Sequence, residues 1–425
     1  MFCLDVVQII CDFCDLKTQI NLIKTCKEYE ENLKIRKLTC TDEINPKITQ
    51  EILQEKKFNQ LLYLNASNNK KITNVNHLKD TLIELSCGGS EIHQEGINEL
   101  RKLQKLYASW NEKITNVNHL KDYLIELHCA GWRCGIQQEG INELRKLQKL
   151  NADGNKTITN VNHLKDSLIV LDCSWYCGIQ QEGINELRKL QILKACGNEK
   201  ITNVNHLKDT MTGLNCGEWC GIQQNGINEL RKLRTLNARN NKNIINVNYL
   251  KDTIIGLNCS ECCGIQQNGI NELRKLQVLI ASCNEKITNV NHLKDSLIEL
   301  DCSSSNSNSK YRKCAIQQEG INELQKLQKL NANNNEKITN VNHLKDTLIK
   351  LDCGGNCGID QKGINELRLQ ILIANTNKKI TNVNHLKDTL IELDCSWNCG
   401  IGQDGINELR KVQKLNAYNN AKITQ

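Results

Sequence analysis

The sequence predicts an α/β solenoid, a stack of short units with a curved parallel sheet on the concave side and short helices or irregular returns on the convex side. Three observations predict this fold. One nine-residue segment recurs at a nearly constant interval, each interval holds two copies of one apolar pattern, and only the first thirty or so residues do not repeat. We expect residues 1–31 to form a small helical segment and residues 32–425 to form the solenoid.

The recurring segment sets the period of the chain. Successive copies start 42 to 44 residues apart, except for one interval of 51. A period near 43 also fits a helical array or a propeller blade. The sequence pattern within one period therefore has to distinguish between these folds. The segment ITNVNHLKD begins at Ile72, Ile114, Ile158, Ile201, Ile287, Ile338 and Ile380, and the variant IINVNYLKD begins at Ile244.

Each period contains two versions of one shorter pattern. LQKLNANNN begins at Leu327 and LIELDCSWN begins at Leu390, and both fit L-x-x-L-x-[A/C]-x-x-N. This pattern resembles the leucine-rich-repeat signature, with a small Ala or Cys at its third apolar site. The resemblance implies units of 21 to 23 residues that alternate between an Ala and a Cys version. Counting the degenerate start at Ile35, there are about eighteen units.

Alternation around the second Leu predicts a short strand with every other side chain facing inward. No unit can bury its apolar face alone, whereas a stack of parallel strands about 4.8 Å apart makes a continuous core. The Asn at the ninth position is expected to be buried and to bond backbone groups of the neighbouring units. It recurs as Asn69, Asn111, Asn155, Asn198, Asn241, Asn284, Asn335, Asn377 and Asn420.

The N-terminal segment has apolar residues at helical spacing, then a break at CDLKTQ, then INLIKTCKEY, which predicts two or three short helices. It resembles the F-box family in Leu4-Asp5-Val6-Val7, Ile9-Ile10, Phe13, Asp15-Leu16-Lys17, Ile20, Leu22 and Thr25-Cys26-Lys27-Glu28-Tyr29. The family's opening Leu-Pro aligns with Phe2-Cys3, so the proline of its adaptor contact is missing. The alternative is that these helices only cap the first repeat.

The F-box resemblance implies a Skp1-type adaptor as a partner. The adaptor-binding residues that it implies are Leu4, Val6, Ile9, Ile10, Phe13, Leu16, Ile20 and Leu22. The Asn- and Lys-rich wording of the repeats is also similar to F-box and repeat proteins of giant DNA viruses of amoebae.

The composition limits the kinds of partner that the protein can bind and the cellular compartment in which we expect it. The 425 residues carry a net charge of +7, with Lys and Arg spread evenly, which makes a nucleic-acid site unlikely in the absence of a basic patch. The N-terminus carries Asp5 and Asp12 and lacks the positive start of a signal peptide, and no apolar run is long enough to span a bilayer. With 23 cysteines, we expect free thiols in a reducing cytoplasm, the host's if the protein is viral.

The repeated His and Cys residues do not predict a metal site, a cofactor or a catalytic centre. Seven of the nine His lie in NVNHLKD, and equivalent positions two units apart are separated by about 10 Å, whereas zinc ligands lie about 2.0 to 2.3 Å from one ion. Paired cysteines such as Cys173 and Cys177 are better explained as small buried apolar groups. We therefore expect no enzyme.

Variable positions of the units carry the predicted partner-binding surface. All five Trp fall at the eighth or ninth position of the pattern, and Trp, Tyr and Arg are the residues that anchor protein interfaces. The alternative is that these rings pack locally over the sheet edge. The predicted partner-binding residues are Trp110, Trp132, Trp175, Trp219, Trp397, Tyr107, Arg239 and Tyr418, with Asp153, His128 and Glu218 beside them.

The 51-residue interval adds a polar loop, Cys302 to Cys314, on the same side of the units. It either shapes the binding surface or is an indifferent insertion. Placed ahead of leucine-rich repeats, the F-box resemblance implies a substrate-recognition subunit of a cullin-type ubiquitin ligase, whose helices would hold the adaptor and whose repeats would hold the target protein. The alternative is a plain interaction or structural solenoid with no link to ubiquitin.

Overall fold

A computed structural model describes residues 3–40, 43–305 and 313–424 of the chain. The chain divides into two compact units, Met1–Ile201 and Thr202–Gln425. Each unit is built from stacked repeats, so the two are described in turn. In the part of the chain that the model covers, no helix combines the length and the apolar character that crossing a bilayer requires.

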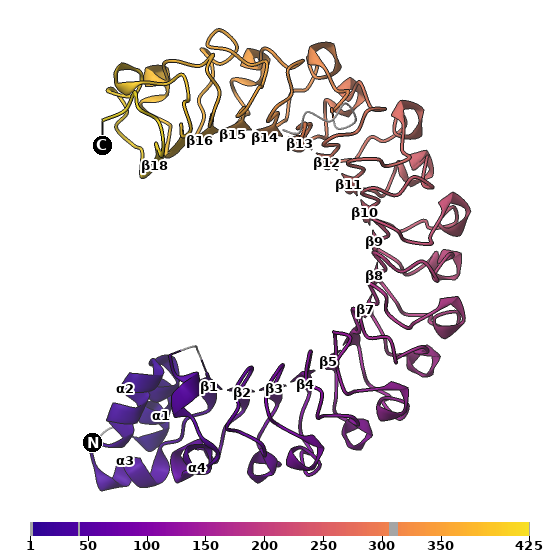
Figure 1. Cartoon of the computed structure of the whole chain (residues 1–425), viewed down its shortest axis with the longest axis vertical. Coiled ribbons are helices and arrows are strands. Elements are labelled where there is room, and N and C mark those ends of the chain that lie inside the picture. Colours follow the sequence, from indigo (N-terminus) through magenta and orange to yellow (C-terminus); the bar gives the residue numbers. More distant parts are fainter. Residues whose placement is uncertain (1–2, 41–42, 306–312, 425) are drawn as a thin grey trace. The chain divides into compact units, whose positions relative to one another are not determined.

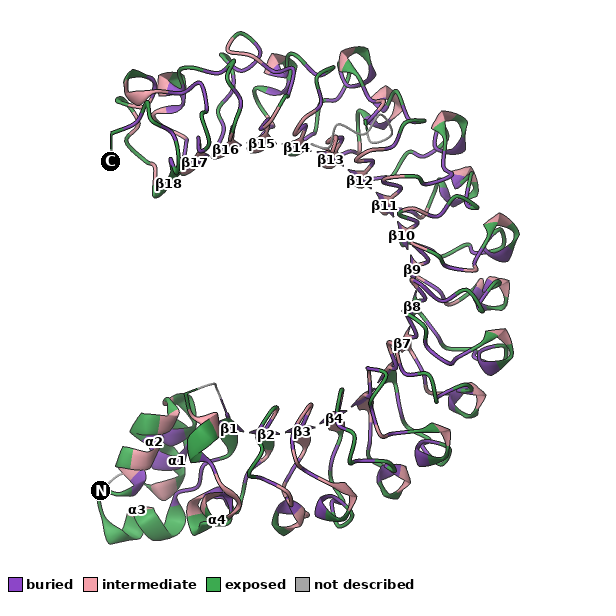
Figure 2. Ribbon diagram, viewed as in Figure 1, coloured by how far each residue is buried: buried purple, intermediate pink, exposed green. Residues whose placement is uncertain are grey.

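Three helices open the first unit, as the N-terminal pattern predicts: α1 (Leu4–Phe13), α2 (Leu16–Ile23) and α3 (Lys27–Asn32). Asp15 caps α2 by accepting a hydrogen bond from the Thr18 backbone N–H at 3.0 Å. The Gln8 side chain ties α1 to the chain entering the first strand, because it both donates to and accepts from the Lys34 backbone at 2.8 Å. α3 buries none of its residues, and Figure 2 shows it almost wholly exposed.

Eight parallel strands follow in the first unit, and a short helix, α4 (Gln50–Leu53), lies between the first two. Each strand pairs with the next one along the chain, with the central Leu residues in register, as in Leu38 opposite Leu64. The strands are β1 (Lys37–Thr39), β2 (Tyr63–Asn65), β3 (Glu84–Ser86), β4 (Lys105–Tyr107), β5 (Glu126–His128), β6 (Lys149–Asn151), β7 (Val170–Asp172) and β8 (Ile192–Lys194).

The second unit repeats this arrangement with ten parallel strands among its described residues, again paired in chain order and in the same register. Its strands are β9 (Gly213–Asn215), β10 (Thr235–Asn237), β11 (Gly256–Asn258), β12 (Val278–Ile280), β13 (Glu299–Asp301), β14 (Lys329–Asn331), β15 (Lys350–Asp352), β16 (Ile371–Ile373), β17 (Glu392–Asp394) and β18 (Lys414–Asn416).

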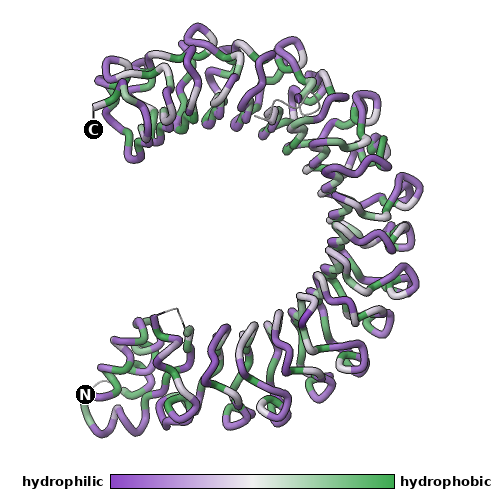
Figure 3. The backbone as a smooth tube through the Cα atoms, in the orientation of Figure 1, coloured by the Kyte–Doolittle hydropathy of each residue, from purple (hydrophilic) through white to green (hydrophobic). Residues whose placement is uncertain are grey.

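Short 3-10 helices make the return segments opposite the strands (Figure 1). Within each unit the strands lie on the concave side and these turns on the convex side, where Figure 3 shows a hydrophilic surface. One series comes from the NHL segment, beginning with Asn76–Leu78, and the other from the Q-x-G segment, beginning with Gln94–Gly96. The predicted leucine-rich-repeat solenoid with an N-terminal helical segment is therefore the observed fold.

The core lies between the strands and the return segments, and its polar members are mainly the predicted Asn residues. Asn111 is typical: its amide donates to the Cys87 and Ile92 carbonyls at 3.1 Å, and its oxygen accepts from the Lys113 and Ile114 backbone N–H groups. The ladder of buried amides is thus confirmed. It satisfies backbone groups that have no partner in the sheet.

The sequence pattern did not predict how the convex returns are held. The Gln94 side chain accepts from the Thr115 and Asn116 backbone N–H groups and donates to the Asn116 carbonyl. A Cβ added to Gly96 would lie 2.2 Å from the Thr73 carbonyl oxygen, so only glycine fits where adjacent returns touch. The Gln and Gly of the Q-x-G segment are therefore needed for packing on the convex side.

Candidate interaction sites

The turn that leaves each strand carries the variable side chains. We call the residues at the seventh, eighth and ninth positions of the pattern the rim, and the eighth position the turn position. At the turn position the backbone is mostly left-handed, a conformation that Gly and Asn adopt readily and bulky residues avoid. Accordingly, Asn or Gly occupies many of these sites: Asn68, Gly89, Gly131, Gly154, Gly197, Asn240, Asn334, Gly355 and Asn419.

Three tryptophans nevertheless occupy the turn position, with φ of 61° at Trp110, 44° at Trp175 and 57° at Trp397. A left-handed conformation costs a non-glycine residue about 1 to 2 kcal/mol. Backbone strain of this kind is concentrated at functional sites in proteins. The exposed fractions of the five tryptophans run from 39% for Trp175 to 66% for Trp219, so local packing alone does not account for them.

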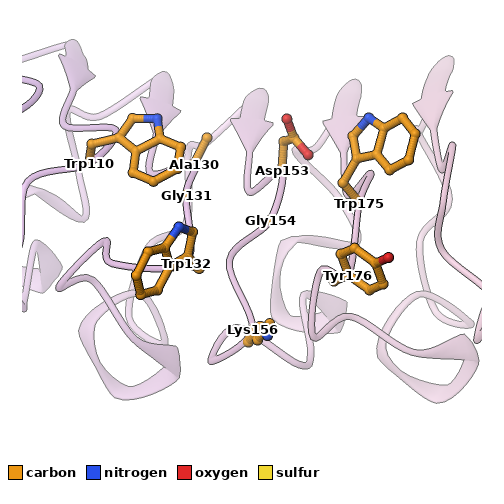
Figure 4. A pocket seen from close by; sticks show the side chains of 9 residues that line it. All are labelled: Trp110, Ala130, Gly131, Trp132, Asp153, Gly154, Lys156, Trp175 and Tyr176. Carbon is orange, nitrogen blue, oxygen red and sulfur yellow. The ribbon is translucent and has the colours of Figure 1, made fainter.

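Three of these tryptophans come together in the first unit (Figure 4). Trp110 and Trp132 form one wall of a cleft of about 340 Å³, and Trp175 and Tyr176 form the other. Gly131 and Gly154 form its floor, and we call this site the aromatic cleft. The cleft is completed by Ala130, Asp153 and Lys156.

Two glycines of successive units receive the turn-position rings. A Cβ added to Gly131 would lie 2.8 Å from the Trp110 indole, and one added to Gly197 would lie 2.8 Å from the Trp175 indole. Each ring therefore leans over the glycine of the next unit along the stack. The pairing of a strained Trp with a following Gly is what holds each wall of the aromatic cleft in place.

Asp153 and Lys156 are the two charged residues that line the aromatic cleft. The Oδ1 atom of Asp153 is buried and accepts no hydrogen bond from any residue that the model describes. Burial raises the pKa of this carboxyl; Asp172 adds to the rise and Lys194 opposes it. Lys194 is itself paired with Asp172, at 3.4 Å. Lys156 lies at the opposite end of the cleft from Asp153 (Figure 4).

The remaining predicted partner-binding residues do not join this cleft. The Tyr107 ring lies 4.6 Å from the His128 ring on the neighbouring strand, and Trp397 and Tyr418 pack edge to face at 5.3 Å in the second unit. Trp219 also belongs to the second unit. The grouping of Trp110, Trp132 and Trp175 was not visible in their positions within the pattern.

Arg239, also in the second unit, is held by two carboxylates. Its guanidinium lies 3.3 Å from Glu218 and 2.6 Å from Glu261, residues of the preceding and following turns. We call these three residues the paired rim. Because its charge is already matched, Arg239 is a weaker candidate for partner binding than the sequence indicated.

Five lining residues of the aromatic cleft were missing from the sequence prediction: Ala130, Gly131, Gly154, Lys156 and Tyr176. Tyr176 could have been found, because it has the ninth position that Trp132 and Trp219 occupy. Lys156 could not have been found from the sequence, because Lys is common at this position of the repeat. Only the aromatic side chains around it in the structure distinguish Lys156 from the other lysines.

The predicted adaptor-binding residues are all accessible. Val6, Ile9, Ile10 and Phe13 are exposed on α1, with 89% of Phe13 exposed, while Val7 and Cys11 of the same helix are buried. The other four, Leu4, Leu16, Ile20 and Leu22, are half-buried. None of the eight is part of the core.

The repeated His and Cys side chains serve the scaffold. His119 Nε2 lies 3.0 Å from the Ile97 carbonyl of the preceding unit, and burial lowers the pKa of this ring. Burial likewise raises the pKa of the Cys134 thiol to about 11, which leaves it protonated and unreactive near neutral pH. Among the described residues, no three or more His, Cys, Asp or Glu side chains gather as a metal site would require.

The inserted loop cannot be placed on this surface. Cys302 and Cys314 at its two ends are buried, and residues 306–312 between them lie outside the described part of the chain.

Comparisons with known proteins bear on the fold. No protein-family model matches the chain, and no curated protein matches it. Solved structures do. A leucine-rich-repeat protein of Leptospira interrogans, LIC12759, is similar at 20% identity over 94% of this chain and 98% of its own, with a TM-score of 0.46.

Two further solved structures are similar to the chain. The TLR13–ssRNA13 complex is similar at 16% identity over 92% of this chain and 64% of the receptor chain, with a TM-score of 0.50. The Rad7–Elc1 complex of yeast is similar at 16% identity over 91% of each chain, with a TM-score of 0.44. At these identities the likeness concerns the fold alone.

Proposed function

We propose that this chain is the substrate-recognition subunit of a cullin-type ubiquitin ligase. Helices α1 to α3 bind a Skp1-type adaptor, and the rim of the repeats binds the target protein. Such a subunit needs no catalytic residue or cofactor, because it acts by raising the concentration of its target near a ubiquitin-loaded enzyme. The buried thiols suit a reducing cytoplasm, that of the host if the protein is viral.

One observation carries the adaptor half of this proposal: the apolar residues that α1 leaves exposed. Val6, Ile9, Ile10 and Phe13 are exposed although α1 has a buried side on which Val7 and Cys11 pack. A cluster of exposed large apolar side chains on a short helix favours an interaction with another protein. These four residues are also among those that the F-box resemblance assigns to the adaptor.

A specific contact favours the second candidate function, a plain interaction scaffold whose helices only cap the stack. The paired Gln8–Lys34 hydrogen bonds and the Arg36–Asp12 ion pair at 3.2 Å attach α1 to the chain around β1. Deleting the helices would therefore remove a cap as well as an adaptor site. Substitutions on the exposed side of α1 separate the two candidates, and deletion does not.

The test measures binding of the full chain to a purified Skp1-type adaptor by calorimetry. We expect Ile9→Asp and Phe13→Asp each to weaken binding about tenfold or more, because each places a charge in an apolar contact. Tyr123→Asp is the control, an exposed aromatic residue outside the helices whose exposed fraction of 50% is close to the 56% of Ile9, and it should bind like the parent. Thermal unfolding of all variants should be unchanged. No adaptor binding by the parent chain, or equal binding by all variants, would overturn the proposal in favour of the capping function.

A further inference from the structure

We propose that the aromatic cleft binds an arginine side chain of the target protein. The inference rests on the half of the proposed function that gives the rim to the target, and it names the chemistry that the rim recognises. Three features support it: the aromatic walls of the cleft, the carboxylate of Asp153, and the stacking of an arginine of the chain on Trp132.

The walls present aromatic rings at considerable cost to the fold. Trp110 and Trp175 take the turn position with φ of 61° and 44°, and Tyr176 beside Trp175 also has a positive φ, of 60°. Most other units place Gly or Asn at the turn position, and the other left-handed turn positions hold Glu, Cys, Thr or the Trp of the second unit. Aromatic faces carry negative electrostatic potential and attract cations within about 6 Å of the ring centre. A cleft walled by three tryptophans and a tyrosine therefore favours a cation over an anion.

The carboxylate of Asp153 provides the directional part of the site. Its Oδ1 is buried between the two walls and has no hydrogen-bond partner among the described residues. Leaving a buried acceptor unpaired costs about 1 to 3 kcal/mol, and more when the group is charged. Asp153 as a whole is half-buried, so a cation that enters the cleft lies against a partly accessible carboxyl group and brings the opposite charge to it.

Arginine fits this arrangement better than lysine does. The guanidinium is planar, weakly hydrated and able to stack on an indole while donating to a carboxylate, whereas the lysine ammonium is a strongly hydrated point charge. The cleft is also open and flat-walled, with glycines at its floor, which suits a flat group. One wall ring already stacks with an arginine of the chain outside the cleft lining, since the Arg133 guanidinium lies 4.4 Å from the centre of the Trp132 ring.

The test uses the full chain with fluorine-labelled tryptophan, whose five residues give five resonances in solution. The probes are a capped glycine-rich peptide with one arginine, and the same peptide with citrulline or lysine in its place. Citrulline keeps the shape of arginine and removes its charge. We expect the arginine peptide to shift the signals of Trp110, Trp132 and Trp175 and to leave those of Trp219 and Trp397 in place.

Two variants sharpen the measurement. Asp153→Asn should weaken binding of the arginine peptide about tenfold, because it removes the charge and keeps the size of the side chain. Asp122→Asn is the matched control, an exposed aspartate on a convex return, and should leave binding unchanged. Unchanged positions of the Trp219 and Trp397 resonances without peptide, together with cooperative thermal unfolding, show that both variants keep the fold.

Three results would overturn the inference: equal shifts with the citrulline peptide, equal binding of the lysine peptide, or equal shifts at Trp219 and Trp397. Binding of the Skp1-type adaptor to the same labelled protein is measured in parallel. If adaptor binding is retained and the arginine peptide does not bind, the inference fails and the adaptor half of the proposed function stands. If the arginine peptide binds and the adaptor does not, the inference stands and the adaptor half of the proposed function fails.

Discussion

The aromatic cleft of the first unit and the paired rim of the second are built on the same turn and have opposite contents. At the paired rim, Asn240, Glu218 and Glu261 take the left-handed turn position, with φ of 56°, 36° and 60°, and the two glutamates match the charge of Arg239. At the aromatic cleft, tryptophan takes the turn position and Asp153 has a buried oxygen without a partner. One site satisfies its own charged groups, and the other has a buried carboxylate oxygen with no hydrogen-bond partner among the described residues.

This difference teaches how a repeated scaffold acquires a site. The strands, the buried Asn residues and the convex returns under the two rims are the same, so the backbone offers the same turn at each. A rim with paired charges gains little from a partner, since its ion pairs are already made. A rim with strained rings and an unpaired carboxylate is the part of the molecule that binding would improve.

The largest expected effect tests whether the scaffold under the two sites is equivalent. Asn155→Ala below the aromatic cleft and Asn241→Ala below the paired rim each remove two hydrogen bonds to carbonyls of the preceding unit and others to the turn that follows. We expect each to lower the free energy of unfolding by about 3 kcal/mol, since buried backbone groups lose their partners. Denaturant unfolding measures this. A difference between the two variants of more than about 1 kcal/mol would contradict a common scaffold.

A smaller effect is expected at the floor of the cleft. Gly131→Ala puts a Cβ at φ of 103° and 2.8 Å from the Trp110 ring, so we expect a loss of about 1 to 3 kcal/mol in denaturant unfolding. Trp110→Asn in the same chain should restore part of this loss by removing the contact. The matched control is Gly256→Ala, where the new Cβ would meet only the Thr235 methyl at 3.5 Å. An equal loss at Gly256 would show that the wall of the cleft is not what Gly131 serves.

The smallest effects distinguish an unpaired charge from a paired one. Burial raises the pKa of Asp153 in the folded chain, so this group's contribution to stability falls as pH rises from the ordinary aspartate range through the raised folded value. Asp153→Asn should therefore be more stable than the parent above that range and equal to it in acid.

Arg239→Ala should lower the free energy of unfolding by at most about 1 kcal/mol, and by less in high salt, because it removes only exposed ion pairs. Thermal unfolding at several pH values and salt concentrations measures both. A pH-independent effect of Asp153→Asn would contradict the assignment.

The repeat pattern was a reliable guide wherever a residue's role depends on its place in one unit. It predicted the strand around the second Leu, the inward Ala or Cys and the buried Asn, and the structure confirms all three. The apolar spacing of the N-terminal segment likewise indicated two or three short helices, and the structure has three there. It did not indicate that α1 keeps Val6 and Phe13 exposed while Val7 is buried, because that depends on what packs beside the helix.

The candidate site was predicted only in part. The tryptophans stood out as rare residues at one place in the repeat. However, the pattern predicted all five of them, and Arg239, as partner-binding residues without distinguishing among them. Which of them meet depends on the ring of one unit leaning over a glycine of the next, as Trp110 does over Gly131. That contact needs both residues and the left-handed turn between them.

By itself the sequence determined the unit, its strand and its buried ladder, because period and alternation act within about twenty residues and each unit repeats the same local physics. Only the tertiary structure decided which variable side chains share a surface and which polar groups stay unpaired. The physical reason is that rings and charges on the rim interact across the stack, with residues that lie about twenty or more positions away along the chain. The residues of the neighbouring unit determine which rim rings and charges pair, and the repeat pattern alone does not predict these pairs.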